Sequence, residues 1–336
     1  MKPTDLALPL SKFLKEYLPS QRNLSGNTVK AYRDTFVLLL RYCRDARGIA
    51  PERLNLDNLD ATFIISFLKY IEEQRHCKSS TRNYRLAAIH SFFRYLQVQC
   101  PERLIQCQRV LAIPKHRCAR PEIGYLQVED LAVILAQPNL TTTQGRRDAV
   151  LLSLLYDTGA RVQELIDLSV RDVRIEIPAQ VRLSGKGRKS RSVPLMARTV
   201  NLLTEYLKEH RLEPSQAETF PLFCNRAGGR LSRSGVRYIL QKYVQKARTV
   251  RPALREGISP HTLRHTKAMH LLQAGNPLVV IRSILGHAEV QTTEMYARAD
   301  MEMTRKALET IAGASPAPEL PSWRKNTSLL EALRNL

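Results

Sequence analysis

Six side chains in the second half of the chain have the chemistry needed to hold and attack a phosphodiester. They are two guanidiniums, an ammonium, two imidazoles and a phenol, at Arg161, Arg264, Lys186, His261, His287 and Tyr296. Guanidinium forks bind phosphate oxygens in pairs, which a lysine ammonium cannot reproduce. A phenol can act as a nucleophile when neighbouring groups offset its developing charge. No carboxylate pair or thiolate cluster accompanies them, so we expect no metal ion and no cofactor.

Arg161 and Lys186 lie at turns that can present a cation to a phosphate. Arg161 precedes a predicted helix, where backbone N–H groups can add to an anion site. An ion pair with Glu164 is the alternative role, and the two are compatible because the carboxylate would orient the guanidinium. Lys186 is flanked by glycines, and its ammonium could protonate a leaving oxygen. Arg188 and Lys189 are rivals for that role, and a turn that merely contacts phosphate is a further alternative.

The histidines and the tyrosine fall in the last third of the chain. His261 follows Ser259-Pro260, a cap and a proline that favour a helix start, where an imidazole tends to stay neutral. His265, one turn later, is expected to be structural. His287 follows a glycine that permits a chain reversal, and Tyr296 comes nine residues later. A phenol with an ordinary pKa of about 10 is protonated near pH 7, so Tyr296 must lose its proton to attack.

These motifs resemble those of the tyrosine recombinase (phage integrase) family, and their order and spacing are most similar to its Xer-like and transposon-borne branches. The motifs that carry the resemblance are Thr158-Gly159-Ala160-Arg161-Val162-Gln163-Glu164-Leu165, Gly185-Lys186-Gly187, His261-Thr262-Leu263-Arg264-His265, Leu285-Gly286-His287 and Tyr296. The resemblance covers about 122–312, and the helical region before it is similar in pattern to the family's core-binding domain. It implies that the six residues named first are catalytic, with Tyr296 as the nucleophile.

The resemblance implies an enzyme that recombines double-stranded DNA at specific sites. Tyr296 would form a 3′-phosphotyrosine, and two rounds of exchange would pass through a Holliday junction. Four protomers would act on two duplexes as a homo-tetramer. We expect a role in the transposition or integration of a mobile element. Xer-type dimer resolution, strand relaxation like that of a type IB topoisomerase, and DNA binding without catalysis are the alternatives.

Composition also favours a polyanionic partner. The 336 residues include 52 Lys and Arg against 31 Asp and Glu, a net charge of +21 with a pI near 10.0. Contacts to phosphates release counterions, so such a charge promotes binding to nucleic acid, although a ribosomal or generic basic surface is the alternative. No secretory signal or apolar stretch of membrane-spanning length occurs, and the six cysteines are irregularly spaced. We therefore expect a cytoplasmic, nucleoid-associated protein without a membrane partner.

The first hundred residues predict a bundle of four or five helices. Apolar residues recur at helical spacing, and capping residues precede several segments, giving helices at 9–19, from 25–28 to about 43, at 61–74 and from 79 onward. Cations near helix starts indicate an external anion, with a solvated basic face as the alternative. The candidates for DNA contact are Lys30, Arg33, Lys78, Arg82 and Arg85, joined by Arg188 and Lys189 from the later turn.

The fold class we predict is mainly α with a small antiparallel β-sheet. The sheet would form from 173–177, 181–183 and 190–193, and the helices from 127–137, 146–157, 161–168, 197–211, 232–248, 260–274, 277–285, 289–297 and 301–312. Segment 108–122 is rich in Pro and Arg and lacks periodicity, which is typical of a linker. The expected division is a helical core DNA-binding domain at 1–112, a linker at 113–122, a catalytic domain at 123–312 and a proline-rich spacer with a final helix at 313–336.

The resemblance implies that the first domain is SAM-like and the second a tyrosine-recombinase catalytic domain. The final helix carries leucines on one face, which suits docking on a neighbouring protomer. Packing on its own subunit is the alternative.

Overall fold

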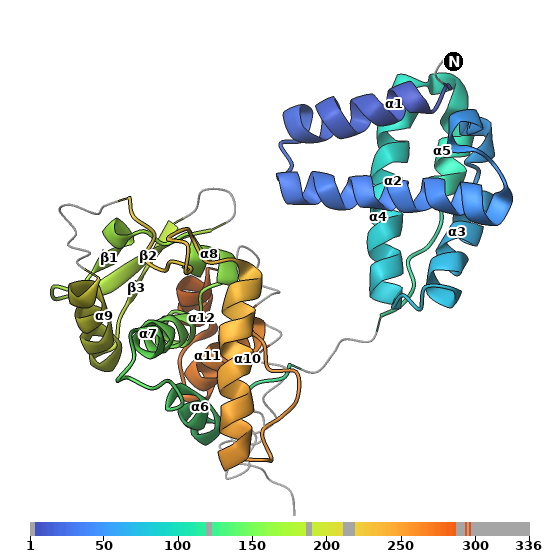
Figure 1. Cartoon of the computed structure of the whole chain (residues 1–336). Helices are drawn as coiled ribbons and strands as arrows, with labels where there is room; N and C mark the ends of the chain where they lie inside the picture. The colour runs from blue at the N-terminus through green and yellow to red at the C-terminus, as the bar shows by residue number, and fades with distance from the viewer. Residues whose placement is uncertain are drawn as a thin grey trace, which may run out of the picture. The chain divides into compact units, whose positions relative to one another are not determined.

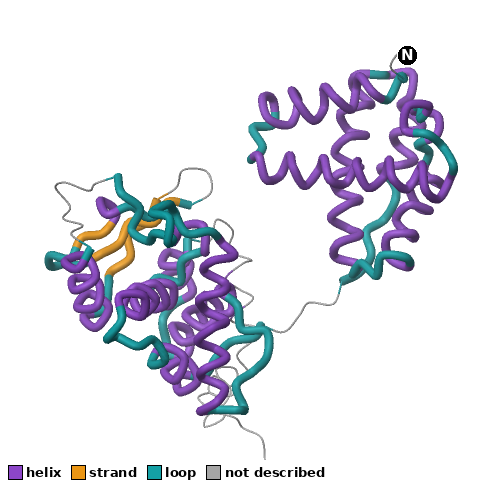
Figure 2. The backbone as a smooth tube through the Cα atoms, viewed as in Figure 1, coloured by secondary structure: helices purple, strands orange, loops and turns teal. Residues whose placement is uncertain are grey.

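The computed structural model describes residues 4–118, 123–185, 190–210 and 219–286, together with Thr293 and Tyr296. The chain divides into two compact units, Met1–Pro121 and Glu122–Leu336. The described residues are mainly helical with one three-stranded antiparallel sheet (Figures 1 and 2), so the predicted fold class is confirmed. The predicted helix at 301–312 and the segment 313–336 lie outside the described residues.

The first unit is a helical bundle around an aromatic core. Its elements are α1 (Ala7–Lys12), η1 (Phe13–Gln21), α2 (Gly26–Arg47), η2 (Pro51–Arg53), η3 (Leu56–Asn58), α3 (Ala61–Glu73), α4 (Ser79–Gln99), η4 (Pro101–Arg103) and α5 (Leu104–Leu111). The side chains of Ser25 and Asp60 cap α2 and α3 by accepting backbone N–H groups. Phe13 and Phe36 both pack edge-on against Phe92, with ring centroids 5.3 Å apart in each pair. Local caps thus set the starts of α2 and α3, and aromatic packing joins the helices.

Two boundaries in this unit differ from the prediction. The first helix does not end near Pro19 but continues to Gln21 as the π-helix η1, which contains Pro19. Segment 108–122 does not begin as a linker, because α5 extends to Leu111. Cys107 and Val110 of α5 are buried in the core of the unit, which holds this helix in place.

The second unit packs helices around α7. Its helical elements are α6 (Val128–Leu135), α7 (Thr143–Asp157), α8 (Val162–Ile166), η5 (Val170–Asp172), α9 (Ala197–Glu209), α10 (Arg233–Val250), α11 (Pro260–Gln273) and α12 (Leu278–Leu285). Helices α9 and α11 both pack against α7, which runs through the middle of the unit (Figure 1). Apolar residues of α7, including Leu151 and Leu154, are fully buried. This core fixes the ends of α7, α11 and α12, where the candidate site lies.

The sheet is formed by β1 (Val173–Arg174), β2 (Gln180–Ser184) and β3 (Ser190–Pro194), paired antiparallel in that order. Strand β1 is shorter than the predicted 173–177, because pairing ends with Arg174 opposite Gln180 and the chain then turns through Pro178. The alternating residues Val181 and Val193 face each other and are buried. The sheet lies at one side of the unit (Figure 2), and residues 186–189 between β2 and β3 lie outside the description.

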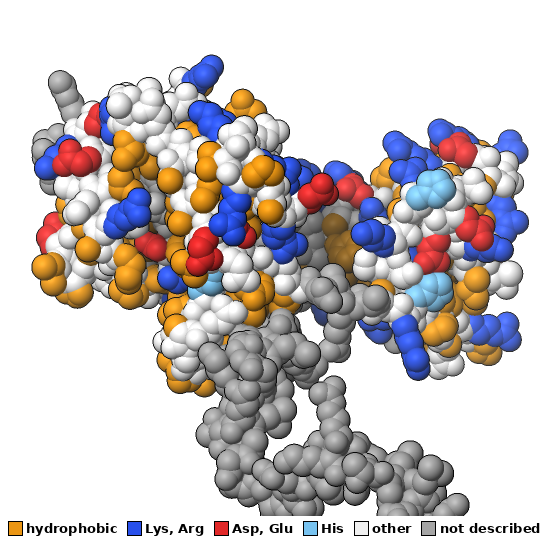
Figure 3. Space-filling view, turned by 90° about the horizontal axis from the view of Figure 1, so that it is seen from below, with side chains coloured by type: hydrophobic (Ala, Val, Ile, Leu, Met, Phe, Trp, Pro, Cys, Tyr) orange, Lys and Arg blue, Asp and Glu red, His pale blue; other side chains and the backbone are white. Residues whose placement is uncertain are grey.

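The surface is rich in basic side chains, as the net charge predicts, and the cysteines are unpaired. Lys and Arg side chains are scattered over the face of the molecule shown in Figure 3, with fewer acidic side chains among them. All six cysteines are described and free, and Cys43 and Cys107 are buried as packing residues. In the described part of the chain, no helix combines the length and apolar character needed to cross a membrane.

Candidate active site

The connection between α7 and α8 is tightly built. The hydroxyl of Thr158 donates to the carbonyl of Leu154 at 2.6 Å and accepts the N–H of Ala160 at 3.2 Å. Gly159 has a φ of +57°, and a Cβ there would lie 2.5 Å from Cδ2 of Leu285. Glycine is therefore required twice at this position, by conformation and by space.

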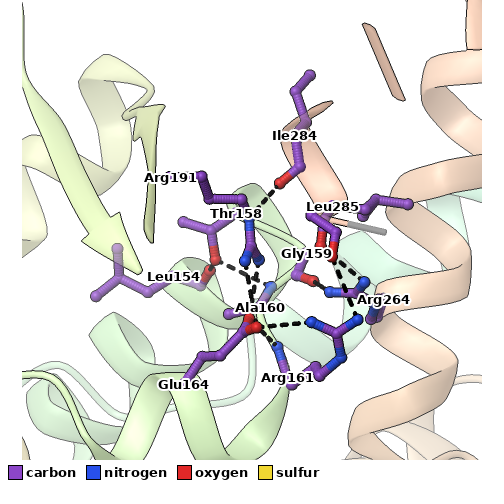
Figure 4. Close-up of polar contacts among 11 residues, drawn as sticks. Leu154, Thr158, Gly159, Ala160, Arg161, Glu164, Arg191, Arg264, Ile284 and Leu285 are labelled. Carbon is purple, nitrogen blue, oxygen red and sulfur yellow. Dashed lines mark hydrogen bonds and ion pairs between the residues drawn. The ribbon is translucent and has the colours of Figure 1, made fainter. Parts of the chain in front are cut away.

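Arg161 follows this connection and caps α8 together with Glu164 (Figure 4). The Arg161 backbone N–H donates to Oε2 of Glu164 at 2.9 Å, and Nη1 donates to Oε1 at 2.7 Å. Nη2 also donates to the carbonyl of Gly286 at 3.4 Å. The predicted ion pair is thus present. Because the Arg161 side chain is 40% exposed while that of Glu164 is 3% exposed, the guanidinium still faces solvent.

Arg264 lies in α11 and joins two distant segments of the chain. Nη1 donates to the carbonyl of Gly159 at 2.6 Å, and Nη2 donates to the carbonyl of Leu285 at 2.8 Å (Figure 4). The side chain is 3% exposed. Burial, reinforced by the charge of Arg161, lowers the pKa of Arg264 to about 10, which leaves it charged at neutral pH.

Arg191 of β3 is part of the same cluster, although the sequence reasoning did not select it. Its guanidinium donates to both oxygens of Glu164, at 3.2 and 2.8 Å, and to the carbonyl of Ile284 at 2.7 Å. Burial acts to raise the pKa of Glu164, but hydrogen bonds from Arg191 and Arg161 outweigh it and hold that pKa below its ordinary value. Two guanidiniums therefore bind one ionised carboxylate, and Arg264 adds a third positive charge to the cluster, which leaves an excess of positive charge suited to an anion.

Tyr296 packs beside this cluster. Its side chain is 1% exposed and lies in an apolar group with Met269 and Leu272 of α11 and Ile281 of α12. The hydroxyl of Tyr296 is 2.8 Å from Nδ1 of His265. The prediction that His265 is merely structural missed this contact. Its place one helical turn after His261 on α11 is the signal that could have revealed it.

Electrostatics connect these groups into one site. Burial raises the pKa of Tyr296, and the charges of Arg264 and Arg161 partly offset this effect. Partial burial of the imidazole lowers the pKa of His261, and the charges of the same two arginines lower it further. Burial and the charge of His261 lower the pKa of His265 to about 4. At neutral pH both imidazoles are neutral and the phenol is protonated, close enough to the two guanidiniums to be influenced by them.

The remaining predicted catalytic residues, Lys186 and His287, lie outside the described residues, as do Arg188 and Lys189. The backbone leading to His287 is described: Gly286 ends α12 with a φ of +64°, the left-handed conformation expected for a chain reversal. Across the described ranges, no group of three or more His, Cys, Asp or Glu side chains is arranged to hold a metal ion.

The predicted DNA-contacting residues of the first unit fall into two groups. Lys30, Arg33 and Lys78 are exposed, with Arg33 held 2.9 Å from the neighbouring Asp34. These cations are available to a ligand, and weak surface pairing would not prevent it.

Arg82 and Arg85 instead bind inside the unit. Arg82 is 5% exposed, donates to the carbonyl of Pro114 at 3.2 Å and pairs with Glu72 at 3.6 Å. Arg85 is partly buried and donates to the hydroxyl of Thr35 in α2 at 3.0 Å. We therefore leave Arg82 out of the proposed DNA-binding set, because reaching a phosphate would break a buried ion pair.

Comparisons with known proteins identify the family. The profile of the phage integrase family matches residues 125–303, and that of the phage integrase N-terminal SAM-like domain matches residues 11–99. The chain is 39% identical to the putative integrase/recombinase y4rC of Sinorhizobium fredii, over 100% of this chain and 99% of that protein. It is 32% identical to tyrosine recombinase XerC of Oceanobacillus iheyensis, over 87% of this chain and 92% of that protein.

Solved structures share the fold at lower identity. The XerH site-specific recombinase bound to a palindromic difH substrate matches with a TM-score of 0.70 and 23% identity, covering 86% of this chain and 81% of that one. The Tn1549 transposon integrase in complex with transposon right end DNA matches with a TM-score of 0.67 and 16% identity, covering 90% and 98%. The sequence matches extend over both units of the chain. The protein accordingly belongs to the phage integrase family of tyrosine recombinases, enzymes that cut and rejoin DNA at specific sites.

Proposed function

We propose that this enzyme cleaves DNA with Tyr296 and forms a 3′-phosphotyrosine. The observation that carries the proposal is the shared location of the phenol and the paired guanidiniums. Arg264 and Arg161 both act on the charge of Tyr296, and Arg161 remains 40% exposed beside it. Phosphoryl transfer needs a positioned nucleophile and offset negative charge more than any other contribution from the protein, and this cluster offers both.

In the proposed cleavage step, the Tyr296 oxygen forms a bond to the scissile phosphorus as the phenol gives its proton to the neutral imidazole of His261. The bond from phosphorus to the 5′ oxygen breaks, and Lys186 supplies the proton that makes the leaving group a 5′ hydroxyl. Arg161 and Arg264 offset the charge on the non-bridging oxygens, and His261 and His287 assist through hydrogen bonds or proton exchange. Neutral His261, with its lowered pKa, suits that part.

Rejoining reverses this chemistry on a different strand. A 5′ hydroxyl from a partner duplex attacks the phosphotyrosine and releases Tyr296, so the ester keeps the bond energy and ATP is not needed. Two such rounds through a Holliday junction recombine two sites. We propose a tetramer on two duplexes, with Lys30, Arg33, Lys78 and Arg85 of the first unit and Arg188 and Lys189 of the second contacting DNA. The expected division at 113–122 and the exchange of 313–336 between protomers belong to the same proposal.

For the biological role we propose the transposition or integration of a mobile element. Similarity to y4rC, named as a putative integrase/recombinase, supports this role over the whole chain. Similarity to XerC and XerD favours dimer resolution as the second candidate. A plasmid carrying two copies of the site distinguishes recombination of either kind from topoisomerase-like relaxation. Recombination requires both copies, whereas relaxation would occur equally well on a plasmid with one copy.

A nicked suicide duplex tests the cleavage step, because loss of a short fragment traps the covalent adduct. The duplex would carry a site selected from randomised DNA by retention on the protein. We expect the adduct to form in EDTA, to disappear in Tyr296→Phe, and to fall on the order of 100-fold or more in Arg161→Ala. DNA binding by Tyr296→Phe should stay near that of wild type. A strict requirement for Mg²⁺, or an adduct that survives in Tyr296→Phe, would refute the mechanism.

A further inference from the structure

Arg191 is a charged residue at an inward-facing position of a strand. In β3 it lies opposite Leu183 of β2 and two residues before Val193, and both of these residues are buried. The Arg191 side chain is 13% exposed. Charged side chains are seldom this buried unless they are paired, so a specific partner is expected here.

The Arg191 guanidinium binds two helices at once (Figure 4). Nη1 and Nη2 donate to the two oxygens of Glu164 in α8, at 3.2 and 2.8 Å. Nε donates to the carbonyl of Ile284 in the last turn of α12, at 2.7 Å. All three nitrogens of the group have protein partners. Arg191 is therefore engaged internally, unlike Arg161, which keeps a solvent-facing side.

Glu164 connects Arg191 to Arg161. Its Oε1 accepts from both guanidiniums, and its Oε2 also accepts the Arg161 backbone N–H at 2.9 Å. Because the Glu164 side chain is 3% exposed, loss of Arg191 would leave a buried carboxylate partly unpaired. The carboxylate would then be free to shift, and Arg161 with it.

Gly286 closes a second connection between the same two arginines. Its carbonyl accepts from Nη2 of Arg161 at 3.4 Å. A Cβ on Gly286 would lie 2.7 Å from Nη1 of Arg191, so the glycine leaves the space that Arg191 occupies. Arg191 also holds Ile284, two residues earlier. Arg161 is thus supported on both sides by groups that Arg191 fixes.

We infer that Arg191 is a positioning residue for strand cleavage, which fixes Glu164 and the end of α12 so that Arg161 meets the scissile phosphate in one orientation. This inference rests on the proposed function. Arg191 acts through Arg161 and does not itself touch the DNA. Lysine cannot replace it, because one ammonium cannot bind a carboxylate as a fork while also reaching the Ile284 carbonyl.

Single-turnover cleavage of the suicide duplex at saturating protein tests the inference. Misplacing a catalytic group by about 1 Å costs roughly 100-fold in rate, so we expect Arg191→Met to slow adduct formation about 100-fold. The dissociation constant of the duplex should change less than about 3-fold, since phosphate contacts elsewhere hold the DNA. Arg182→Met is the matched control: Arg182 lies on the adjacent strand and is 56% exposed, and its loss should leave the rate unchanged.

Chemically altered duplexes show through which group Arg191 acts. A methylphosphonate at the scissile position removes one negative charge, so it reduces the need for Arg161. With it, the ratio of wild-type to Arg191→Met rates should fall to about 10 or less, as it should for Arg161→Ala. A 5′-bridging sulfur gives a leaving group that needs no proton, so it should leave the Arg191→Met ratio unchanged. If the 5′-bridging sulfur restored the cleavage rate of Arg191→Met and the methylphosphonate did not, Arg191 would act with Lys186 on the leaving group. That result would overturn the inference.

A double variant gives an independent check. If Arg191 acts through Glu164, then Glu164→Gln combined with Arg191→Met should lose no more rate than the worse single variant. Multiplied losses would contradict the inference. If Arg191→Met unfolds at the assay temperature, Arg191→Lys replaces it in the same rate measurements, because lysine keeps the positive charge. Wild-type cleavage within about 3-fold of either variant would refute the inference alone, whereas a wild type that forms no adduct would refute the proposed function as well.

Discussion

Single residues keep Tyr296, the proposed nucleophile, protonated. Burial raises the pKa of Tyr296, whereas the pKa of its hydrogen-bond partner His265 is lowered to about 4. Proton transfer from the phenol to this imidazole is therefore strongly unfavourable in the free protein. The unliganded enzyme keeps a protonated phenol, so in the proposed mechanism attack by Tyr296 depends on a change of charge when the DNA phosphate binds.

His265 should make the stability of the protein depend on pH. Its pKa is about 4 when folded and near 6.5 when unfolded, so its contribution is complete above pH 6.5 and is lost as pH falls toward 4. Between pH 7 and 5 this amounts to about 2 kcal/mol of unfolding free energy. Urea unfolding at both pH values should show that His265→Gln loses less stability on acidification than wild type, by about this amount. Identical losses in the two proteins would show that His265 is not held neutral by the fold.

At the scale of elements, the site is a junction of helix ends. The connection after α7, the start of α8 and the end of α12 meet where Arg264 donates to the carbonyls of Gly159 and Leu285. The Leu285 carbonyl lies in the last turn of α12, where the usual intrahelical donor is missing, and the Gly159 carbonyl lies in the connection between α7 and α8. The guanidinium replaces that donor, and it ties the segments to one another at the place where a phosphate would bind.

Gly159→Ala should disrupt this junction. The new Cβ would lie 2.5 Å from Leu285, and the φ of +57° is itself unfavourable for alanine. We expect a loss of about 2 to 4 kcal/mol of unfolding free energy and a slower cleavage rate, from strain and overpacking together. Gly257→Ala is the control, since Gly257 has a φ of +69° but nothing within 4 Å of its Cβ position. Its cost should be strain alone, about 1 to 2 kcal/mol. Equal losses would mean that packing against Leu285 is unimportant.

The elements were predictable because their signals are local. Ser259 and Pro260 mark the start of α11, and alternating residues mark β2 and β3 in the sequence itself. The partners of Arg191 were not predictable, since Glu164 lies 27 residues away and Ile284 lies 93 residues away. Such pairings depend on how helices pack against strands. The buried face of β3 nevertheless carried a hint, since an arginine there needs a partner.

The same reasoning explains the basic residues of the first unit. A cation near a helix start looks equally available in sequence whether it faces solvent or the interior. Lys78 precedes α4 and Arg82 lies in its first turn, yet Lys78 is exposed and Arg82 is bound to Pro114 and Glu72. The position of the segment after α5, which supplies the Pro114 carbonyl, decides between them. Tertiary structure therefore decides which basic side chains are exposed and which are paired inside the unit. Composition and periodicity do not distinguish the two.

At the scale of the whole molecule, the net charge of +21 governs association with DNA. Each phosphate that a cation neutralises releases condensed counterions, so the logarithm of affinity falls linearly with the logarithm of salt concentration. The exposed Lys and Arg side chains (Figure 3) make this contribution large and independent of sequence. Specificity must then arise from base contacts and DNA shape superimposed on that binding.

Lys30→Gln and Lys78→Gln should each reduce the slope of that salt dependence by about 1, because each would remove one of the proposed phosphate contacts. The weakening should be similar for specific and unrelated duplexes, as measured by fluorescence anisotropy from about 50 to 200 mM salt. Lys208→Gln is a control, since Lys208 is exposed on α9 beside Glu205. An unchanged slope in the first two variants would remove these lysines from the DNA-binding surface.

The Arg264 bridge also bears on when the proposed cleavage site can assemble during synthesis of the chain. A ribosome releases Gly159 long before Leu285, and both carbonyls must be present before the bridge can form. Tyr296, the proposed nucleophile, emerges later still. By the proposed mechanism, a polypeptide that stops before Tyr296 would therefore be unable to cleave DNA.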